Sequence, residues 1–163
     1  MPDPILSHRP IRDEDISLIC NFPANLEEVS FMFRNPAYPL PPERLRAALR
    51  EREASTVALV DGSVAGLENF YDCKIGESCS IGNVIVDPKR RGLGVARYLI
   101  ETMTGIAADE YCARQVTLVC FNRNVGGLLL YTKMDFEPYV IEAREDPAGS
   151  RVAAIRMRFR LEG

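Results

Sequence analysis

Residues 81–100 read IGNVIVDPKRRGLGVARYLI, an apolar run that gives way to a proline, basic residues and two glycines. The β-branched residues 84–86 are typical of a short buried strand, and Pro88 must end that strand. Beyond Gly94, apolar residues recur at helical spacing, namely Val95, Leu99, Met103 and Ile106. The segment therefore predicts a buried strand, a tight loop and a helix that runs to about Tyr111.

The predicted loop has the properties of an anion-binding site. A helix N-terminus leaves backbone N–H groups without intrahelical partners and carries the positive end of the helix dipole. Gly92 and Gly94 would let a phosphate reach that backbone, and basic side chains surround them, namely Lys89, Arg90, Arg91 and Arg97. A plain strand-to-helix turn with solvated charges is the simpler interpretation.

Two better-known phosphate loops do not fit these residues. The dinucleotide fingerprint needs a third glycine or an alanine where Arg97 stands, and no acidic residue ends a strand at the usual interval. The nucleoside triphosphate loop needs Gly-Lys followed by serine or threonine, which the sequence lacks. Both interpretations are therefore rejected.

The loop does resemble the coenzyme A loop of the GNAT family of N-acetyltransferases. The family pattern is Gln or Arg, two residues, Gly, one residue, then Gly or Ala, and residues 91–96, RGLGVA, match it fully. The preceding residues Val86-Asp87-Pro88 are similar to the strand end that comes before this loop in the family. A second motif follows downstream.

Residues 124–136, NVGGLLLYTKMDF, resemble the family pattern Asn, two residues, Ala or Gly, then Leu-Tyr and a later Gly-Phe. The matching residues are Asn124, Gly127, Leu130, Tyr131 and Phe136. Asp135 replaces the usual glycine, but aspartate tolerates a left-handed backbone, so we expect the turn after the helix to survive.

This resemblance implies an α/β fold, with a mixed, largely antiparallel sheet flanked by helices on both faces, in a single N-acetyltransferase domain over residues 1–163. In the family, acetyl-CoA is the cosubstrate and sits where the fourth and fifth strands splay apart. The resemblance assigns the backbone at Val84, Ile85 and Val86 to pantetheine and the acetyl carbonyl. It assigns the diphosphate to the loop residues Arg91, Gly92, Leu93, Gly94, Val95 and Ala96.

The implied reaction is direct transfer of the acetyl group from the thioester to a primary amine. By the same resemblance, Asn124 would contact the cofactor, and Tyr131 would be the general acid. The general base stays open: Val119 stands where one branch of the family has a glutamate, so water, Glu68 or Asp72 could take the proton. For a cationic amine, an acceptor site could be lined by Glu27, Glu28, Phe31 and Tyr38, although these residues could equally be surface charges and core aromatics.

Composition limits the other classes of function. A chain of 163 residues with formal net charge −3 argues against a broad nucleic-acid surface. No long apolar run or leader predicts a membrane span or a signal peptide, so we expect a cytoplasmic protein. Five cysteines and one histidine show no metal-ligand spacing, and an odd number of cysteines is typical of reduced thiols.

The remaining residues predict alternating strands and helices. A strand over Ile5 to Arg12 precedes a helix that Asp13 caps and Pro23 ends, and Asn25 can cap a second helix, Leu26 to Arg34. A helix over Arg44 to Arg52 follows a proline-rich loop. Later strands are expected at Thr56–Val60, Val64–Tyr71, Cys79–Val86, Gln115–Phe121, Glu137–Arg144 and Val152–Leu161, with a helix over Val125–Met134.

Cys73 and Cys79 flank one predicted hairpin loop and are expected to face each other, most simply as reduced thiols. Two other classes of function remain as alternatives to an enzyme. One is an acyl-CoA sensor without turnover, against which the presence of Tyr131 argues, and the other is a homodimeric scaffold with an incidental pocket. The amine, small molecule or peptide, is not identified by the sequence, nor is a homodimer excluded.

Overall fold

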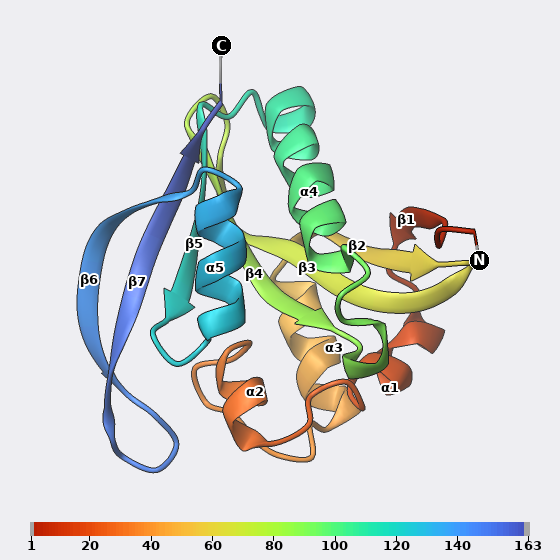
Figure 1. Ribbon diagram of the computed structural model, residues 1–163, viewed down its shortest axis with the longest axis horizontal. Coiled ribbons are helices and arrows are strands. Elements are labelled where there is room, and N and C mark those ends of the chain that lie inside the picture. The colour runs from red at the N-terminus through yellow and green to blue at the C-terminus, as the bar shows by residue number, and fades with distance from the viewer. Residues whose placement is uncertain (1, 162–163) are drawn as a thin grey trace.

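The computed structural model describes residues 2–161, within which seven strands form one sheet (Figure 1). The strands are β1 (Leu6–Pro10), β2 (Glu53–Val60), β3 (Ser63–Lys74), β4 (Ser78–Val86), β5 (Gln115–Phe121), β6 (Glu137–Glu145) and β7 (Arg151–Arg160). The helices are α1 (Ile16–Ile19), α2 (Leu26–Ser30), α3 (Pro42–Arg50), α4 (Val95–Tyr111) and α5 (Val125–Lys133). Short 3-10 turns, Asp13–Asp15 and Pro88–Arg90, precede α1 and α4.

The sheet has the order β1-β2-β3-β4-β5-β7-β6, and its neighbours are antiparallel except for β4 and β5. That parallel pair meets only over Ser78–Ser80 and Gln115–Thr117, so the two strands separate beyond this point. The mixed, largely antiparallel sheet predicted from the sequence is confirmed, and so is the splay between the fourth and fifth strands.

A bulge in β4 accompanies the splay. Leu67 pairs with Ile85 and Asn69 pairs with Gly82, so Asn83 and Val84 together stand opposite the single residue Glu68. Asn83 adopts a left-handed backbone, with φ of 50°, as bulge residues often do. The bulge bends β4 where it leaves β5, which opens the sheet at this end.

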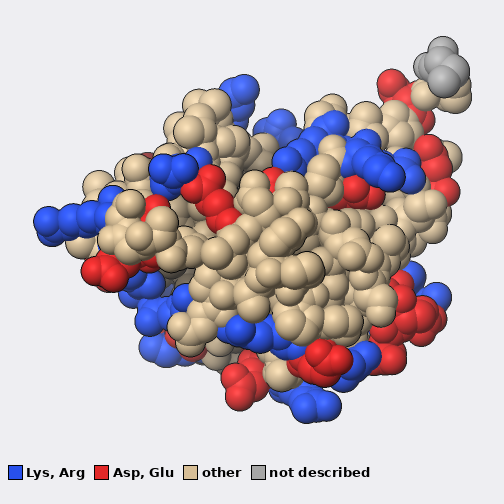
Figure 2. Space-filling view, turned by 90° about the horizontal axis from the view of Figure 1, so that it is seen from below, with Lys and Arg blue, Asp and Glu red and all other residues tan. Residues whose placement is uncertain are grey.

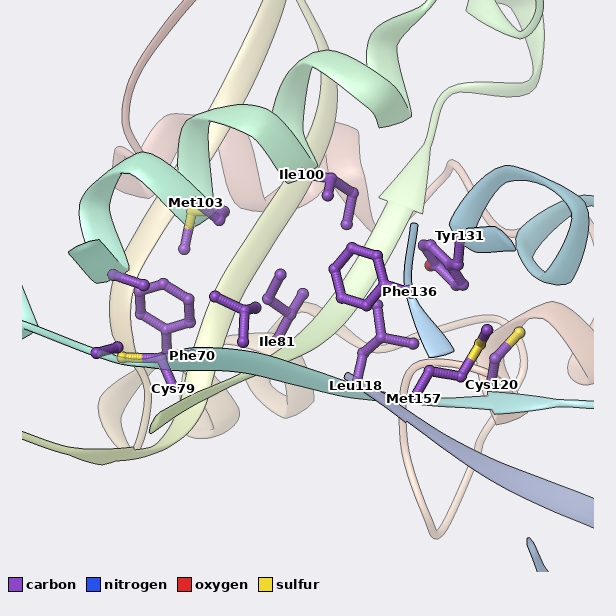
Figure 3. Close-up of a cluster of buried hydrophobic side chains, with 13 residues drawn as sticks. Phe70, Cys79, Ile81, Ile100, Met103, Leu118, Cys120, Tyr131, Phe136 and Met157 are labelled. Atoms are coloured by element: carbon purple, nitrogen blue, oxygen red, sulfur yellow. The ribbon is translucent and has the colours of Figure 1, made fainter. Parts of the chain in front are cut away.

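Helices cover both faces of the sheet. Figure 1 shows α4 and α5 in front of it and α3 behind it. Val57 and Ala58, adjacent on β2, belong to different buried clusters, because successive strand residues point to opposite faces. The cluster under α4 and α5 is drawn in Figure 3 and includes Phe70, Ile100, Met103, Leu118, Tyr131 and Phe136.

Most predicted elements are present, with shifted ends. The hairpin turn is confirmed, because Asp61 and Gly62 both have positive φ, 49° and 85°. Asp135 also adopts positive φ, 66°, so the turn after α5 survives without glycine. The helix predicted over Leu26 to Arg34 is wrong in length: α2 ends at Ser30, and a side-chain amide from β4, that of Asn83, binds the Met32 carbonyl beyond it.

Cys73 and Cys79 are cross-strand neighbours on β3 and β4, as predicted. Their sulfur atoms lie 2.9 Å apart as a hydrogen-bonded pair of free thiols. The redox state of this pair in the cell stays a prediction. In residues 2–161, none of the helices combines the length and the apolar character that crossing a membrane requires.

Candidate active site

A cleft of about 610 Å³ lies where β4 and β5 separate. One wall is the end of β4 with the loop and first turn of α4, and the other wall is the N-terminal half of α5 with the segment before it. Figure 2 shows the molecule from below, where uncharged surface is bordered by acidic and basic side chains. The sheet therefore brings two motifs together that lie some thirty residues apart in sequence.

The α4 wall is built as an anion cradle. Gly92 and Gly94 have φ of 81° and 82°, and a Cβ on either would meet no atom within 4 Å. Gly94 begins the helix without a side-chain cap, so the first N–H groups of this 17-residue helix keep their binding capacity. Arg90, Arg91 and Arg97 line the same wall; Arg91 is paired with Glu28 and Arg97 with Glu101, whereas Arg90 has no acidic partner among the described residues. These features fit the diphosphate of coenzyme A.

The α5 wall depends on Asn124. Its side-chain oxygen accepts a hydrogen bond of 3.0 Å from the backbone N–H of Gly127 and so caps the helix. A Cβ at Gly127 would lie 2.7 Å from the Asn124 amide nitrogen, so the glycine makes room for the cap. Asn124 therefore contributes its remaining amide group to the cleft that it lines.

Tyr131 closes the inner end of this wall. Its side chain is only 6% exposed, lines the cleft and packs against Phe136 with ring centroids 5.9 Å apart (Figure 3). Burial, with the charges of Glu68 and Cys120 as lesser causes, raises the pKa of Tyr131 far above its usual range. The hydroxyl therefore carries its proton at neutral pH.

Of the residues that the sequence assigns to cofactor binding, Leu93 alone is absent from the lining of the cleft. It is 39% exposed and lies between the two glycines. The lining does contain Val84, Ile85, Val86, Arg91, Gly92, Gly94, Val95, Ala96 and Asn124. At Leu93, only the backbone remains as a candidate contact.

Glu68 lies on the α4 side of the sheet, opposite the β4 bulge, and is completely buried. Neither of its carboxylate oxygens has a hydrogen-bond partner among the described residues. Burial raises the pKa of Glu68 well above its usual range, so the carboxyl group favours its neutral form. Because Glu68 is not among the residues that line the cleft, it is poorly placed to be the general base.

The expected acceptor site for a cationic amine is not supported by the geometry. Glu28 is bound to Arg91 at 3.0 Å, and Glu27 is bound to Arg123, so both negative charges are already paired. Tyr38 is 49% exposed and does not line the cleft. Phe31 does line it, as expected.

A second cavity, of about 420 Å³, adjoins the cleft at Phe31 and was not predicted from the sequence. We call it the arginine groove, because its lining includes Arg34, Arg52, Arg144 and Arg156. These residues come from four separate segments of the chain, so no local motif marks them.

Comparison with known proteins agrees with this geometry. The model of the acetyltransferase (GNAT) family matches residues 22–136, and the chain therefore belongs to that family. None of the curated proteins matches the sequence. The structural comparisons that follow concern proteins with low sequence identity to this chain.

Three solved structures illustrate the shared fold. A variant of spermidine N-acetyltransferase from Vibrio cholerae has a TM-score of 0.77 at 18% identity, covering 95% of this chain and 93% of that one. The ribosomal-protein-S18-alanine N-acetyltransferase from Escherichia coli has a TM-score of 0.74 at 16% identity, with coverage of 98% and 97%. A GNAT-family acetyltransferase from Streptococcus pneumoniae has a TM-score of 0.73 at 17% identity, with coverage of 96% and 100%.

Proposed function

We propose that this protein transfers the acetyl group of acetyl-CoA to a primary amine by direct attack. The observation that carries the proposal is the cleft itself, in which an anion cradle on α4 faces Asn124 and a buried, protonated Tyr131. A sensor of acyl-CoA would need the cradle but not a buried hydroxyl at the inner end of the cleft. The structure offers no feature that favours the sensor.

Each wall has a distinct task in this reaction. The bound thioester supplies the activated acetyl group. Backbone N–H groups from Gly92 to Ala96 hold the diphosphate, and the backbone of residues 84–86 binds pantetheine and polarises the acetyl carbonyl. Holding both reactants in the cleft lowers the entropic part of the barrier.

Protons must move at two atoms during the transfer. The amine nitrogen forms a bond to the acetyl carbon as the carbon–sulfur bond breaks, and Tyr131 gives its hydroxyl proton to the departing sulfur. The amine must lose a proton, and Glu28, the one carboxylate among the described residues that line the cleft, is bound to Arg91. Asp72 is exposed on β3 and does not line the arginine groove, so we assign this proton to water.

An acceptor screen with acetyl-CoA tests the proposal. Release of free thiol and a gain of one acetyl group in the mass of the amine should occur together for at least one class of amine. Thiol release without an acetylated product would indicate hydrolysis instead. Acetyl-CoA binding without either product, across all classes of amine, would favour the sensor. A cytoplasmic location and a homodimer both stay predictions.

A further inference from the structure

The arginine groove lies on the face of the sheet opposite α4 and α5. Val119 and Phe121 alternate with the buried residues Leu118 and Cys120 along β5, and it is Val119 and Phe121 that line the groove. Its four arginines come from the segment after α2, the turn between α3 and β2, strand β6 and strand β7. No acidic side chain is among the described residues that line it.

Two of these arginines share one carboxylate. Arg144 donates to Glu142 at 3.2 Å, and the Nε atom of Arg156 lies 3.1 Å from the other oxygen of Glu142. That Nε atom is buried and does not meet hydrogen-bond geometry. One negative charge therefore faces two guanidinium groups, and the donors of Arg156 are not all used.

Arg52 has no acidic partner among residues 2–161. Its guanidinium lies over the ring of Tyr71, 5.4 Å from the centroid, and burial lowers its pKa. A Cβ at Gly82 would come within 2.8 Å of the Tyr71 ring and 3.3 Å of an Arg52 nitrogen, so glycine on β4 leaves the space that both side chains occupy. The result is a partly desolvated cation, held on the strand by an aromatic ring.

The groove meets the cleft at the β4 bulge. Asn83 lines the groove, its neighbour Val84 lines the cleft, and Phe31 lines both. Asn83 is fixed by its hydrogen bonds to Asn69 and to the Met32 carbonyl, at 3.1 and 3.0 Å. A small molecule in the groove would therefore have one end beside the strand to which the acetyl carbonyl is assigned.

We propose that the arginine groove is the acceptor site and that it selects a primary amine that also carries a carboxylate group, as a free amino acid does. This inference rests on the proposed acetyl transfer. Guanidinium groups bind carboxylates through paired hydrogen bonds, and a partly desolvated arginine gains most from such a partner. The same arginine charges repel polycations, so we expect spermidine to be a poor acceptor.

The test compares kcat/KM for matched acceptors. Each free amino acid of a panel is set against its own methyl ester and against the amine that lacks the carboxylate, with spermidine as the polycation. We expect the free acid to be preferred by at least about 10-fold, which is the effect of one charged hydrogen bond. Equal or better use of the ester, the plain amine or spermidine would overturn the inference.

Arginine variants test whether the preference for the free acid arises in the groove. Arg52→Gln and Arg156→Gln should each lower kcat/KM for the free acid by about 10- to 100-fold while leaving that for the ester within a few-fold. Arg46→Gln is the matched control, because Arg46 is bound to Asp13 and does not line the groove. Equal losses for acid and ester in the groove variants would contradict a carboxylate contact.

The two proposals fail in different ways. If neutral amines are acetylated regardless of Arg52 and Arg156, the acetyl transfer stands and the selection of a carboxylate is wrong. If no amine is acetylated, calorimetry still measures whether the same amino acids bind to the groove. Binding that Arg52→Gln weakens would support the groove assignment alone, and absence of binding by every amino acid in the panel would overturn it.

Discussion

Tyr131 has a buried side chain that lines the inner end of the cleft. Phe136 packs against its ring and so holds the side chain in place. Because burial raises its pKa, the hydroxyl is protonated throughout the physiological pH range. The Tyr131 hydroxyl therefore holds a proton at the moment when the proposed transfer to sulfur needs one.

Tyr131→Phe should therefore lower turnover much more than cofactor affinity, because the ring still packs and only the hydroxyl is lost. General acid catalysis is worth about 10²- to 10⁴-fold, and we expect a loss of kcat in that range. Steady-state kinetics and calorimetric titration with acetyl-CoA measure the two quantities separately. If kcat stays at the wild-type level while chemistry limits the rate, solvent protonates the sulfur and the assignment of Tyr131 is wrong.

Glu68 is the other unusual residue, since a completely buried carboxyl group without partners destabilises a fold when it ionises. Its pKa is raised in the folded state above the unfolded value of about 4.3. The unfolded chain therefore releases this proton first as pH rises. Stability falls from about pH 4.3 up to the folded pKa, by at most about 1.4 kcal/mol per pH unit, and then levels off.

Glu68→Gln removes this titration and should flatten the pH dependence of stability above about pH 4.3. Urea unfolding at several pH values from 5 to 8 measures the free energy of unfolding for both proteins. Asp72→Asn is the matched control, because Asp72 is an exposed carboxylate on the same strand, and it should leave the slope unchanged. A wild-type slope in Glu68→Gln would mean that the buried carboxyl does not ionise over this range.

At the scale of elements, local motifs explain what could be predicted. The β4 strand, its loop and α4 are contiguous, so the residues of the cradle could be proposed from one local motif that resembles the coenzyme A loop. Asn124 and Tyr131 were proposed from a second local motif, but the cap that Asn124 makes on α5 was not predicted. Helix α2 could not be delimited in this way, because a side chain from β4 binds the chain just beyond its end.

The arginine groove shows the limit of local reasoning. Its lining depends on strand register, which places β7 against β5 and β6 against β7, and on the bulge at Asn83, whose side chain binds the segment after α2. Neither contact leaves a pattern in the sequence. The ion pairs of Glu27 and Glu28 could not be predicted either, since their arginine partners are 96 and 63 residues away, respectively.

At the scale of the whole molecule, the cleft exists because the sheet is divided. Strands β1 to β4 carry the anion cradle, strands β5 to β7 carry α5, and the strands of the two parts pair over three residue pairs, between β4 and β5. Membership of the GNAT family and the similarity in fold agree with this arrangement. We propose that acetyl-CoA binds between these two parts, with its diphosphate on the N-terminus of α4.

Calorimetric titration of the wild type and of Gly94→Glu with acetyl-CoA tests this binding mode. The glutamate adds bulk and negative charge where the diphosphate is assigned, so we expect binding by the wild type that weakens with salt and no detectable binding by the variant. Gly62→Glu is the control, since it places the same side chain at a similar positive φ in the β2–β3 turn, where a Cβ would also meet no atom within 4 Å. A folded Gly94→Glu variant that binds acetyl-CoA as tightly as the wild type would contradict the placement of the diphosphate at the N-terminus of α4.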